Sequence, residues 1–342
     1  MNNDLKVADF VALAVAAEEA GFDQLWVSHD LFLRSAPVLL AAAAGSTTRI
    51  ALGSGVLNPY SAHPVELAMH AAALQELSGG RFLLGLAAGA AEFLGLAGIA
   101  QQHPLWQTRQ AVLACRALLA GSSPSGPSSP SSPPRSAAGG AGSWAPGARL
   151  LAVPETPVPI YLGAMSPRML ALAGELCDGA LALLYPPEHF PVAAAQVAAG
   201  AVAAGRTLEA IDLPACVWVS VDDDPVAARA ALADKLAYYG AAFAPYLLER
   251  VGLVPDDFRP AAAALAAGEH EAARSLVTAP MLRLGIAGAP EDVVARCLGL
   301  LAAGATHLSF GPPLGPDPLR SVSLLGSEVI PALRAAAPPL IG

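Results

Sequence analysis

Short apolar runs alternate along this chain with longer stretches in which apolar residues recur at helical spacing. Parallel strands are joined by long crossover connections, usually helices, so this alternation indicates a parallel sheet built from strand–helix units. The runs predicted to be strands are residues 24–28, 49–58, 81–86, 157–163, 178–184, 214–221 and 305–311. The length of 342 residues suits one barrel of such units with insertions. We therefore predict an α/β fold, a (β/α)8 TIM barrel with insertions, in which the first strand is short or missing.

The start of the chain and two inner segments depart from the regular alternation. Residues 7–20 already have helical spacing, so the chain opens where the first helix of a barrel is expected. Either residues 1–6 supply a short first strand, or the start of the chain has been lost or mis-assigned. Residues 121–146 are nearly all Gly, Ser, Pro and Ala, which predicts a flexible insertion, and the helix-rich residues 225–280 predict a helical insertion. We expect one barrel domain over residues 1–342.

Composition excludes several other classes of protein. Hydrophobic residues make up 54% of the chain and charged residues 14%, which excludes a disordered chain. The net charge of −9, with no Lys/Arg cluster, argues against a nucleic-acid partner. The four cysteines are far apart and form no C-x-x-C pair, which predicts reduced, buried thiols in a cytoplasmic protein. No metal site is expected, because no metal-ligand spacing connects the histidines His103, His189, His270 and His307.

One segment needs comparison with a membrane helix. Residues 82–100 carry a single charge, Glu92, and approach the length that spans a bilayer. The segment is rich in Gly and Ala and poor in large aliphatic residues, so a strand followed by a loop is favoured. Residues 1–6 lead directly into an amphipathic segment, so we expect neither a signal peptide nor membrane association.

Several sequence stretches together carry a family resemblance. They are AEEAGFDQLWVSHD (17–30), SGVLNPYSAHP (54–64), LQELSGGRFLLGLAAG (74–89), PIYLGAMSPRMLALAGELCDG (159–179) and the C-terminal stretch 286–318. They resemble the bacterial luciferase-like flavin and deazaflavin oxidoreductases, and within them the methylenetetrahydromethanopterin reductase-like branch. The stretches occur in the expected order and cover more than half of the chain, so the combination is specific although each motif alone is weak.

The candidate site residues follow the ends of the predicted strands. Function in a barrel is located at the carboxyl ends of its strands, where these side chains converge on one rim. The catalytic candidates are His29 and Asp30. The cofactor-binding candidates are Gly55, Val56, Asn58, Gly89, Gly163, Ala164, Met165 and Ser166.

Two of these positions are assigned to the cofactor by the resemblance. It implies a kinked backbone at Gly55-Val56, often with a non-prolyl cis peptide, that supports one face of the flavin-type ring. The alternative is a strand-end bulge without a ligand. Ser166 and Pro167 suit the N-cap and first position of a helix, and the resemblance implies that the cofactor phosphate binds there, with Arg168 as a helper. The alternative is a capped helix that binds no phosphate.

The chain also departs from the family pattern. The family has Asp then His where this chain has His29 then Asp30, so the two side chains are expected to point in different directions. His29 suits acid–base chemistry or a hydrogen bond to the cofactor, and Asp30 suits orienting His29 or capping the loop. Some deazaflavin enzymes carry Glu where this chain has Ala90, and Glu92 is expected to be a solvated loop carboxylate. His63 is a further candidate for substrate contact.

The resemblance implies hydride transfer between coenzyme F420, a deazaflavin, and a small organic substrate. One alternative is an FMN-dependent monooxygenase of the same fold, because reduced FMN activates oxygen and deazaflavin does not readily do so. Another is a flavin-binding barrel with little chemistry. The expected partners are a small-molecule substrate and a second copy of the chain in a homodimer.

Overall fold

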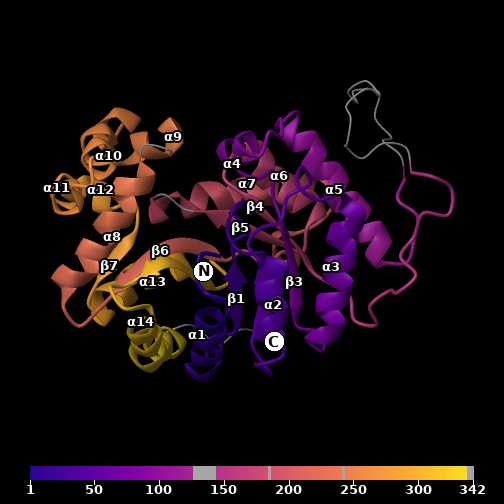
Figure 1. The fold of residues 1–342 in the computed structure, drawn as a ribbon, viewed down its shortest axis with the longest axis horizontal. Coiled ribbons are helices and arrows are strands. Elements are labelled where there is room, and N and C mark those ends of the chain that lie inside the picture. The colour runs from indigo at the N-terminus through magenta and orange to yellow at the C-terminus, as the bar shows by residue number, and fades with distance from the viewer. Residues whose placement is uncertain (126–143, 184–185, 241–242, 337–342) are drawn as a thin grey trace. The chain divides into compact units, whose positions relative to one another are not determined.

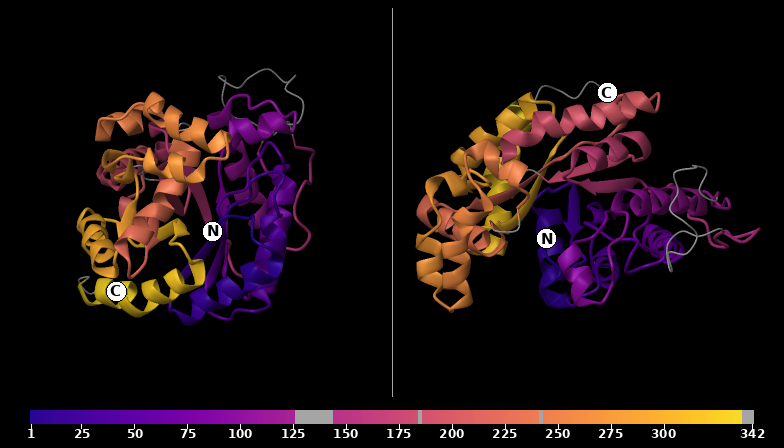
Figure 2. Two further views of the ribbon diagram at one scale, coloured as in Figure 1. Left: turned by 60° about the vertical axis from the view of Figure 1, so that its left-hand side comes forward. Right: turned by 90° about the horizontal axis from the view of Figure 1, so that it is seen from above.

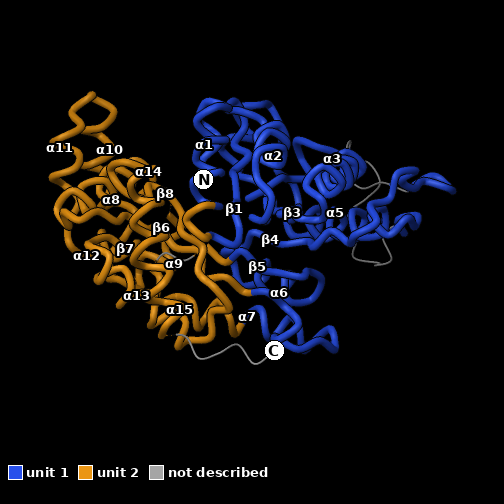
Figure 3. The backbone as a smooth tube through the Cα atoms, turned by 90° about the horizontal axis from the view of Figure 1, so that it is seen from below, with its two compact units in different colours: residues 1–18, 22–181, 196–212 blue, residues 19–21, 182–195, 213–342 orange. Residues whose placement is uncertain are grey.

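The computed structural model describes residues 1–125, 144–183, 186–240 and 243–336 (Figure 1). Most of the insertion predicted at 121–146 lies outside these ranges. The strand and helix alternation can be followed by colour in two further views (Figure 2). The chain divides into two compact units (Figure 3): residues 1–18, 22–181 and 196–212 form unit 1, and residues 19–21, 182–195 and 213–342 form unit 2.

Unit 1 is a parallel sheet with its connecting helices. Its strands are β1 (Gln24–Val27), β2 (Ala51–Ser54), β3 (Phe82–Leu86), β4 (Ile160–Ala164) and the start of β5 (Gly179–Leu183), paired in that order. The connecting helices are α1 (Val7–Glu19), α2 (Ala36–Ala44), α3 (Pro64–Leu77), α4 (Ala91–Leu96), α5 (Pro104–Leu119), α6 (Pro167–Leu176) and the end of α7 (Phe190–Ala203). Proline opens α3, α5 and α6, where its missing N–H leaves no helical bond unmade.

Unit 2 is built around β6 (Ala215–Val221), whose seven residues are all buried. The end of β5 pairs with β6 at Ala182 and Ala215, and β7 (Ile286–Gly288) and β8 (Leu308–Leu314) both pair parallel with β6. Its helices are α8 (Pro225–Tyr239), α9 (Pro245–Leu248), α10 (Arg259–Ala266), α11 (His270–Ser275), α12 (Ala279–Leu282), α13 (Pro290–Ala302), α14 (Pro318–Leu324) and α15 (Ile330–Ala336). A π-helical turn, Leu325–Val329, joins α14 to α15.

The seven predicted strands are confirmed, with small differences in their bounds. The short strand β7 is an eighth that the sequence did not predict. The loop predicted after residue 86 is wrong in part, because residues 91–96 form the helix α4. No strand forms in residues 1–6, although the Met1 amine donates to the Trp26 carbonyl at 2.6 Å and the Met1 carbonyl accepts from Ser28 N at 2.9 Å.

Two aromatic rings fill one face of the unit 1 sheet. A Cβ atom on Gly53 would lie 2.2 Å from the Trp26 ring, and one on Gly179 would lie 2.1 Å from the Tyr161 ring. The two rings meet edge to face with their centroids 4.9 Å apart. The Tyr161 hydroxyl donates to Asp212 at 2.7 Å. Burial raises the pKa of this tyrosine well above its usual value, and the Asp212 charge raises it as well. Glycine at positions 53 and 179 is therefore what allows these rings to lie flat on the sheet.

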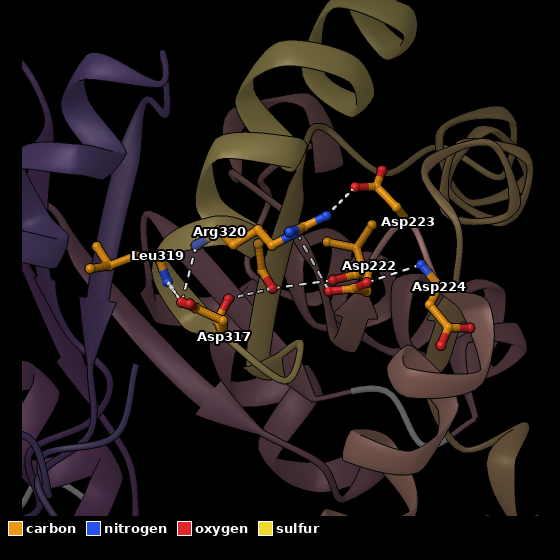
Figure 4. Close-up of polar contacts among 8 residues, drawn as sticks. Asp222, Asp223, Asp224, Asp317, Leu319 and Arg320 are labelled. Carbon is orange, nitrogen blue, oxygen red and sulfur yellow. Dashed lines mark hydrogen bonds and ion pairs between the residues drawn. The ribbon is translucent and has the colours of Figure 1, made fainter.

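In unit 2 an arginine connects the segment after β6 to α14 (Figure 4). Arg320 forms an ion pair with Asp223 and lies 3.8 Å from an Asp222 oxygen. Asp317 caps α14 by accepting from Leu319 N at 3.0 Å and from Arg320 N at 3.2 Å. Arg320 and Asp223 are solvent-exposed, so their ion pair contributes little to stability.

All four cysteines are buried and form no disulfide. Burial raises the pKa of Cys115, Cys177 and Cys297 to about 12. Within the described residues no helix is long and apolar enough to span a membrane.

Glu18, near the end of α1, accepts hydrogen bonds from the backbone N–H groups of Thr48, Arg49 and Ile50, the last at 2.8 Å. Desolvation raises the pKa of Glu18, but these bonds outweigh it and lower the pKa to about 2. Between pH 4.5 and 2 the unfolded chain therefore binds more protons, so this contribution to stability is complete above pH 4.5 and is lost as pH falls toward 2. We expect Glu18→Gln to lower the free energy of unfolding by about 1 kcal/mol at pH 7 and to have a smaller effect near pH 2.

Urea denaturation at both pH values measures this difference, with the exposed neighbour Glu19→Gln as the control. An equal loss at both pH values would show that the charge of Glu18 is irrelevant.

Candidate cofactor and substrate site

Three strand ends of unit 1 meet around Val56. The Gly55–Val56 peptide bond is cis, which is the geometry that the resemblance implied. A Cβ atom on Gly163 would lie 3.0 Å from Val56 Cγ1 and 3.3 Å from the Ala87 Cβ. The ends of β2, β3 and β4 therefore approach each other here, and glycine at position 163 allows Val56 to pack this closely.

Asn58 and Gly89 form a second close contact. Asn58 is only 5% exposed, and its Oδ1 accepts from Tyr60 N at 3.0 Å and Ser61 N at 2.9 Å. Because Oδ1 is used in this way, Nδ2 is the atom of Asn58 that is available to a ligand. Gly89 has a φ of +76°, and a Cβ there would lie 3.1 Å from Asn58 Cγ. Glycine is required at this position both for its left-handed backbone and for the close approach of Asn58.

His29 points toward the start of α2. Its Nδ1 accepts the backbone N–H of Ala36 at 3.1 Å, so the ring caps that helix and carries its proton on Nε2. Burial lowers the pKa of His29, and His70 lowers it further, while Asp30 has the opposite effect. At neutral pH His29 is therefore an uncharged hydrogen-bond donor through Nε2.

A cavity of about 210 Å³ lies beside His29, within unit 1. The polar side chains that line it are His29, Ser35, Asn58, Ser61, Glu66 and His70. The structure thus brings His29 and Asn58 to one cavity. Among the described parts of the chain, no group of three or more His, Cys, Asp or Glu side chains converges closely enough to hold a metal ion.

Asn3 holds the loop that contains the catalytic candidates. Its side chain is fully buried. Its Nδ2 donates to the Asp30 carbonyl at 3.0 Å and to the Arg34 carbonyl at 2.7 Å. Its Oδ1 accepts from Ser28 Oγ at 2.9 Å and from Asp30 N at 3.3 Å. Both backbone polar groups of Asp30 are therefore bound by one side chain, and sequence reasoning missed this residue.

Replacing Asn3 with alanine is expected to lower the free energy of unfolding by about 2–3 kcal/mol, because several buried partners lose their hydrogen bonds at once. Urea denaturation measures the loss. Among the residues that the structure describes, the half-buried neighbour Asn2 has no such hydrogen bonds, and Asn2→Ala is expected to change stability by about 0.5 kcal/mol or less. Equal effects of the two substitutions would contradict the role given to Asn3.

Ser166 occupies the N-cap position of α6, and Pro167 follows it. The Ser166 side chain is exposed and makes no capping hydrogen bond, whereas its carbonyl accepts from Met169 N and Leu170 N. Ala164 is buried, and Arg168 is exposed. The turn after β4 therefore offers the Ser166 hydroxyl and the Arg168 side chain to a ligand.

Comparison with known proteins identifies the family. The family model described as luciferase-like monooxygenase matches residues 2–307. The chain belongs to this family. It is 35% identical over 328 residues to a 5,10-methylenetetrahydromethanopterin reductase of Methanolobus tindarius, a match that covers 95% of this chain and 96% of that protein. It is 31% identical to an F420-dependent glucose-6-phosphate dehydrogenase of Beutenbergia cavernae, over 96% of this chain and 94% of that protein.

The fold of this luciferase-like chain is confirmed by a solved structure. The coenzyme F420-dependent tetrahydromethanopterin reductase of Methanopyrus kandleri superposes with a TM-score of 0.86 at 30% identity, covering 97% of both chains. The predicted α/β fold of TIM-barrel type and the predicted reductase-like branch are therefore both confirmed.

Two further candidates of the luciferase-like chain lie at helix starts. His63 caps α3 by accepting from Val65 N at 3.3 Å, and its ring lies 5.3 Å from the ring of Trp144. Glu92 is exposed in the first turn of α4, so its expected exposure is confirmed, although it belongs to a helix and not a loop. Among the described residues, no hydrogen bond joins His63 or Glu92 to Val56 or Gly163.

Proposed function

We propose that this chain is an F420-dependent oxidoreductase that transfers a hydride between the deazaflavin and a small organic substrate. The observation that carries the proposal is the near full-length similarity to F420-dependent enzymes, at 30% and 31% identity. The site fits such a cofactor, because the cis Gly55–Val56 peptide lies beside Gly163, where the absence of a side chain leaves the backbone bare. When bound, F420 supplies hydride chemistry at its C5 atom.

Each rim residue then has a role in binding. The Gly55–Val56 backbone and the Val56 side chain would support one face of the ring. The bare backbone of Gly89 and Gly163 would let the ring approach closely, and Ala164 and Met165 would line the turn beside it. Asn58 Nδ2 supplies a donor to the polar edge of the ring. The Ser166 hydroxyl and Arg168 bind the phosphate at the start of α6, where the helix dipole favours negative charge.

Asp30 and His29 have different roles in the proposed reaction. His29 is turned toward α2, which leaves the adjacent Asp30 carboxylate as the proposed proton acceptor. When a substrate is oxidised, its C–H bond gives up a hydride with two electrons, and the proton of the adjacent O–H or N–H passes to the Asp30 carboxylate. In the reverse reaction, the hydride and the proton return to the substrate. His29, uncharged and fixed by α2, orients the substrate through Nε2–H.

Separate titrations of the purified chain with F420 and FMN test the cofactor assignment. Trp26 is the reporter, because its Cβ is 3.4 Å from where a Cβ of Gly55 would lie. We expect tight binding of F420 and weak or no binding of FMN. Preferential binding of FMN would favour the alternative of an FMN-dependent monooxygenase. Binding of neither F420 nor FMN would refute the proposed cofactor site.

A matched pair of variants locates the binding. Gly163→Val places a side chain against Val56, whereas a Cβ on the helical Gly95 meets nothing within 4 Å. We expect Gly163→Val to weaken F420 binding about tenfold or more and Gly95→Val to leave it unchanged. Binding without turnover on any alcohol, amine or reduced pterin would support the alternative of a weakly catalytic flavin-binding barrel.

The homodimer prediction is supported by exposed apolar residues on unit 1. Phe32 is 69% exposed, Val38 58% and Met69 56%, and they lie on the β1–α2 loop, α2 and α3. We propose that a second copy covers this apolar surface. Sedimentation of the wild-type chain and of Val38→Lys tests it, because a dimer that forms elsewhere would survive the added charge. The cytoplasmic location stays a prediction.

A further inference from the structure

Gln101 connects the segment that follows α4 back to the end of β3. Its side-chain Nε2 donates to the Ala88 carbonyl and to the Gly89 carbonyl, both at 2.9 Å. Both protons of this amide nitrogen are therefore used by backbone that lies thirteen and twelve residues earlier in the chain. Gln101 is half-buried, whereas its neighbour Gln102 is exposed. One side chain thus holds the backbone of the turn at Gly89.

Tyr60 joins the same segment to the loop after β2. Its hydroxyl donates to the Gln102 carbonyl at 2.6 Å, and its N–H donates to Asn58 Oδ1 at 3.0 Å. Burial raises the pKa of Tyr60 to about 12, so the hydroxyl stays protonated and remains a donor at neutral pH. Gly89 lies against Asn58, since a Cβ there would be 3.1 Å from Asn58 Cγ. The contacts therefore form a closed ring through Gly89, Asn58, Tyr60, Gln102 and Gln101.

This ring of contacts also fixes the direction of two backbone N–H groups. The peptide bonds on either side of Gly89 are trans, and a trans peptide directs its N–H away from its carbonyl. Because the Ala88 and Gly89 carbonyls bind Gln101, the N–H groups of Gly89 and Ala90 are directed away from Gln101. Neither N–H forms a hydrogen bond within the described ranges. Both are therefore available to a ligand, as is the Nδ2 of the neighbouring Asn58.

We infer that Gln101 is a positioning residue of the cofactor site, which holds the Gly89 turn against Asn58 so that a bound ring meets donors in fixed places. The inference rests on the proposed function, which puts the cofactor at these residues. Donors that are already in place need no reorganisation when a ligand binds, so loss of Gln101 is expected to weaken binding. Gln101 contacts only backbone carbonyls, and the substrate proton passes to Asp30, so the rate of hydride transfer is expected to change little.

The first measurement uses the chain without cofactor. The backbone N–H signal of Gly89 and the side-chain NH2 signals of Asn58 are followed by NMR in the wild type, in Gln101→Leu and in Gln102→Leu. Leucine resembles glutamine in size but has no donor. We expect the signals to shift in Gln101→Leu and to stay in place in Gln102→Leu. Unchanged signals in Gln101→Leu would overturn the inference, whether or not the chain binds F420.

The second measurement is the F420 titration followed by Trp26 fluorescence. We expect Gln101→Leu to raise the Kd about fivefold, and Gln101→Glu about tenfold or more, because a carboxylate would oppose two carbonyl oxygens. Tyr60→Phe removes the bond to the Gln102 carbonyl and is expected to raise the Kd about threefold. Gln102→Glu adds the same charge at an exposed position and is expected to leave the Kd within about twofold.

The rate of the loaded enzyme separates positioning from a role in the reaction. At saturating F420 we expect kcat of the Gln101 variants to stay within about twofold of the wild type. A large fall in kcat without a change in Kd would contradict the positioning role. Failure of the wild type to bind F420 would refute the proposed function and with it this inference. Wild-type binding together with equal Kd values for Gln101→Glu and Gln102→Glu would overturn this inference alone.

Discussion

Replacing Asp30 with asparagine is expected to lower kcat about 100-fold or more while changing the affinity for F420 by about threefold or less. Asparagine keeps the size of the side chain and the backbone bonds to Asn3 but cannot take up the substrate proton. Stopped-flow measurement of deazaflavin reduction under saturating substrate isolates this step, and the F420 titration measures binding on its own. The two readouts separate a failure of the Asp30 assignment from a failure of the cofactor assignment.

His29→Asn is the informative companion to that variant. Asparagine can still accept the Ala36 N–H at the start of α2, but it does not reach as far into the cavity. We therefore expect KM for the substrate to rise about tenfold, with a smaller change in kcat, because His29 orients the substrate and does not take the proton. The exposed Asp9→Asn serves as the charge control. Full activity of Asp30→Asn together with inactive His29→Asn would reverse the two roles.

Gly200→Leu is expected to destabilise the fold by about 3 kcal/mol or more, or to prevent folding altogether. The backbones of α6 and α7 touch at two glycines. A Cβ on Gly200 would lie 1.9 Å from the Ala171 carbonyl oxygen, and a Cβ on Gly174 would lie 1.9 Å from the Val197 carbonyl oxygen. Backbone atoms on both sides leave no flexible group to move aside, so the helices must separate to admit a side chain.

The same substitution at an open position provides the control. Gly299, on α13, is exposed and has no atom within 4 Å of an added Cβ. Gly299→Leu is therefore expected to raise the free energy of unfolding by about 0.5–1 kcal/mol, since leucine is the better helix former. Urea denaturation of both variants should give changes of opposite sign. A loss at Gly299 as large as that at Gly200 would show that a leucine destabilises these helices wherever it is placed, and that the contact of α6 with α7 is not responsible.

The sequence predicted the strands well because each is a local pattern. Apolar runs bounded by turn residues identify a buried strand without knowledge of the rest of the chain, as for β3 and β6. The strand β7 has three residues, too few to show any period. The helix α4 was missed because Gly95 and the surrounding alanines gave no clear spacing of large apolar residues.

The candidate site was predictable in part for a similar reason. Parallel strands end at one edge, so Val56 with Gly163 and Asn58 with Gly89 could be expected to meet before any coordinates were known. The role of Asn3 could not be predicted, because it depends on hydrogen bonds to backbone groups about thirty residues away. The capping of α2 by His29 was also unpredicted, because histidine is not a residue that usually signals a helix start.

The buried cysteines have a practical consequence for labelling. Thiol-reactive dyes attack the thiolate, and thiols with a pKa of about 12 and no contact with solvent react slowly at neutral pH. A cysteine introduced at an exposed position, for example Val226→Cys on α8, would then be the fast-reacting thiol. Fluorescent or spin-labelled protein for ligand titrations can therefore be prepared with Cys115, Cys177 and Cys297 in place.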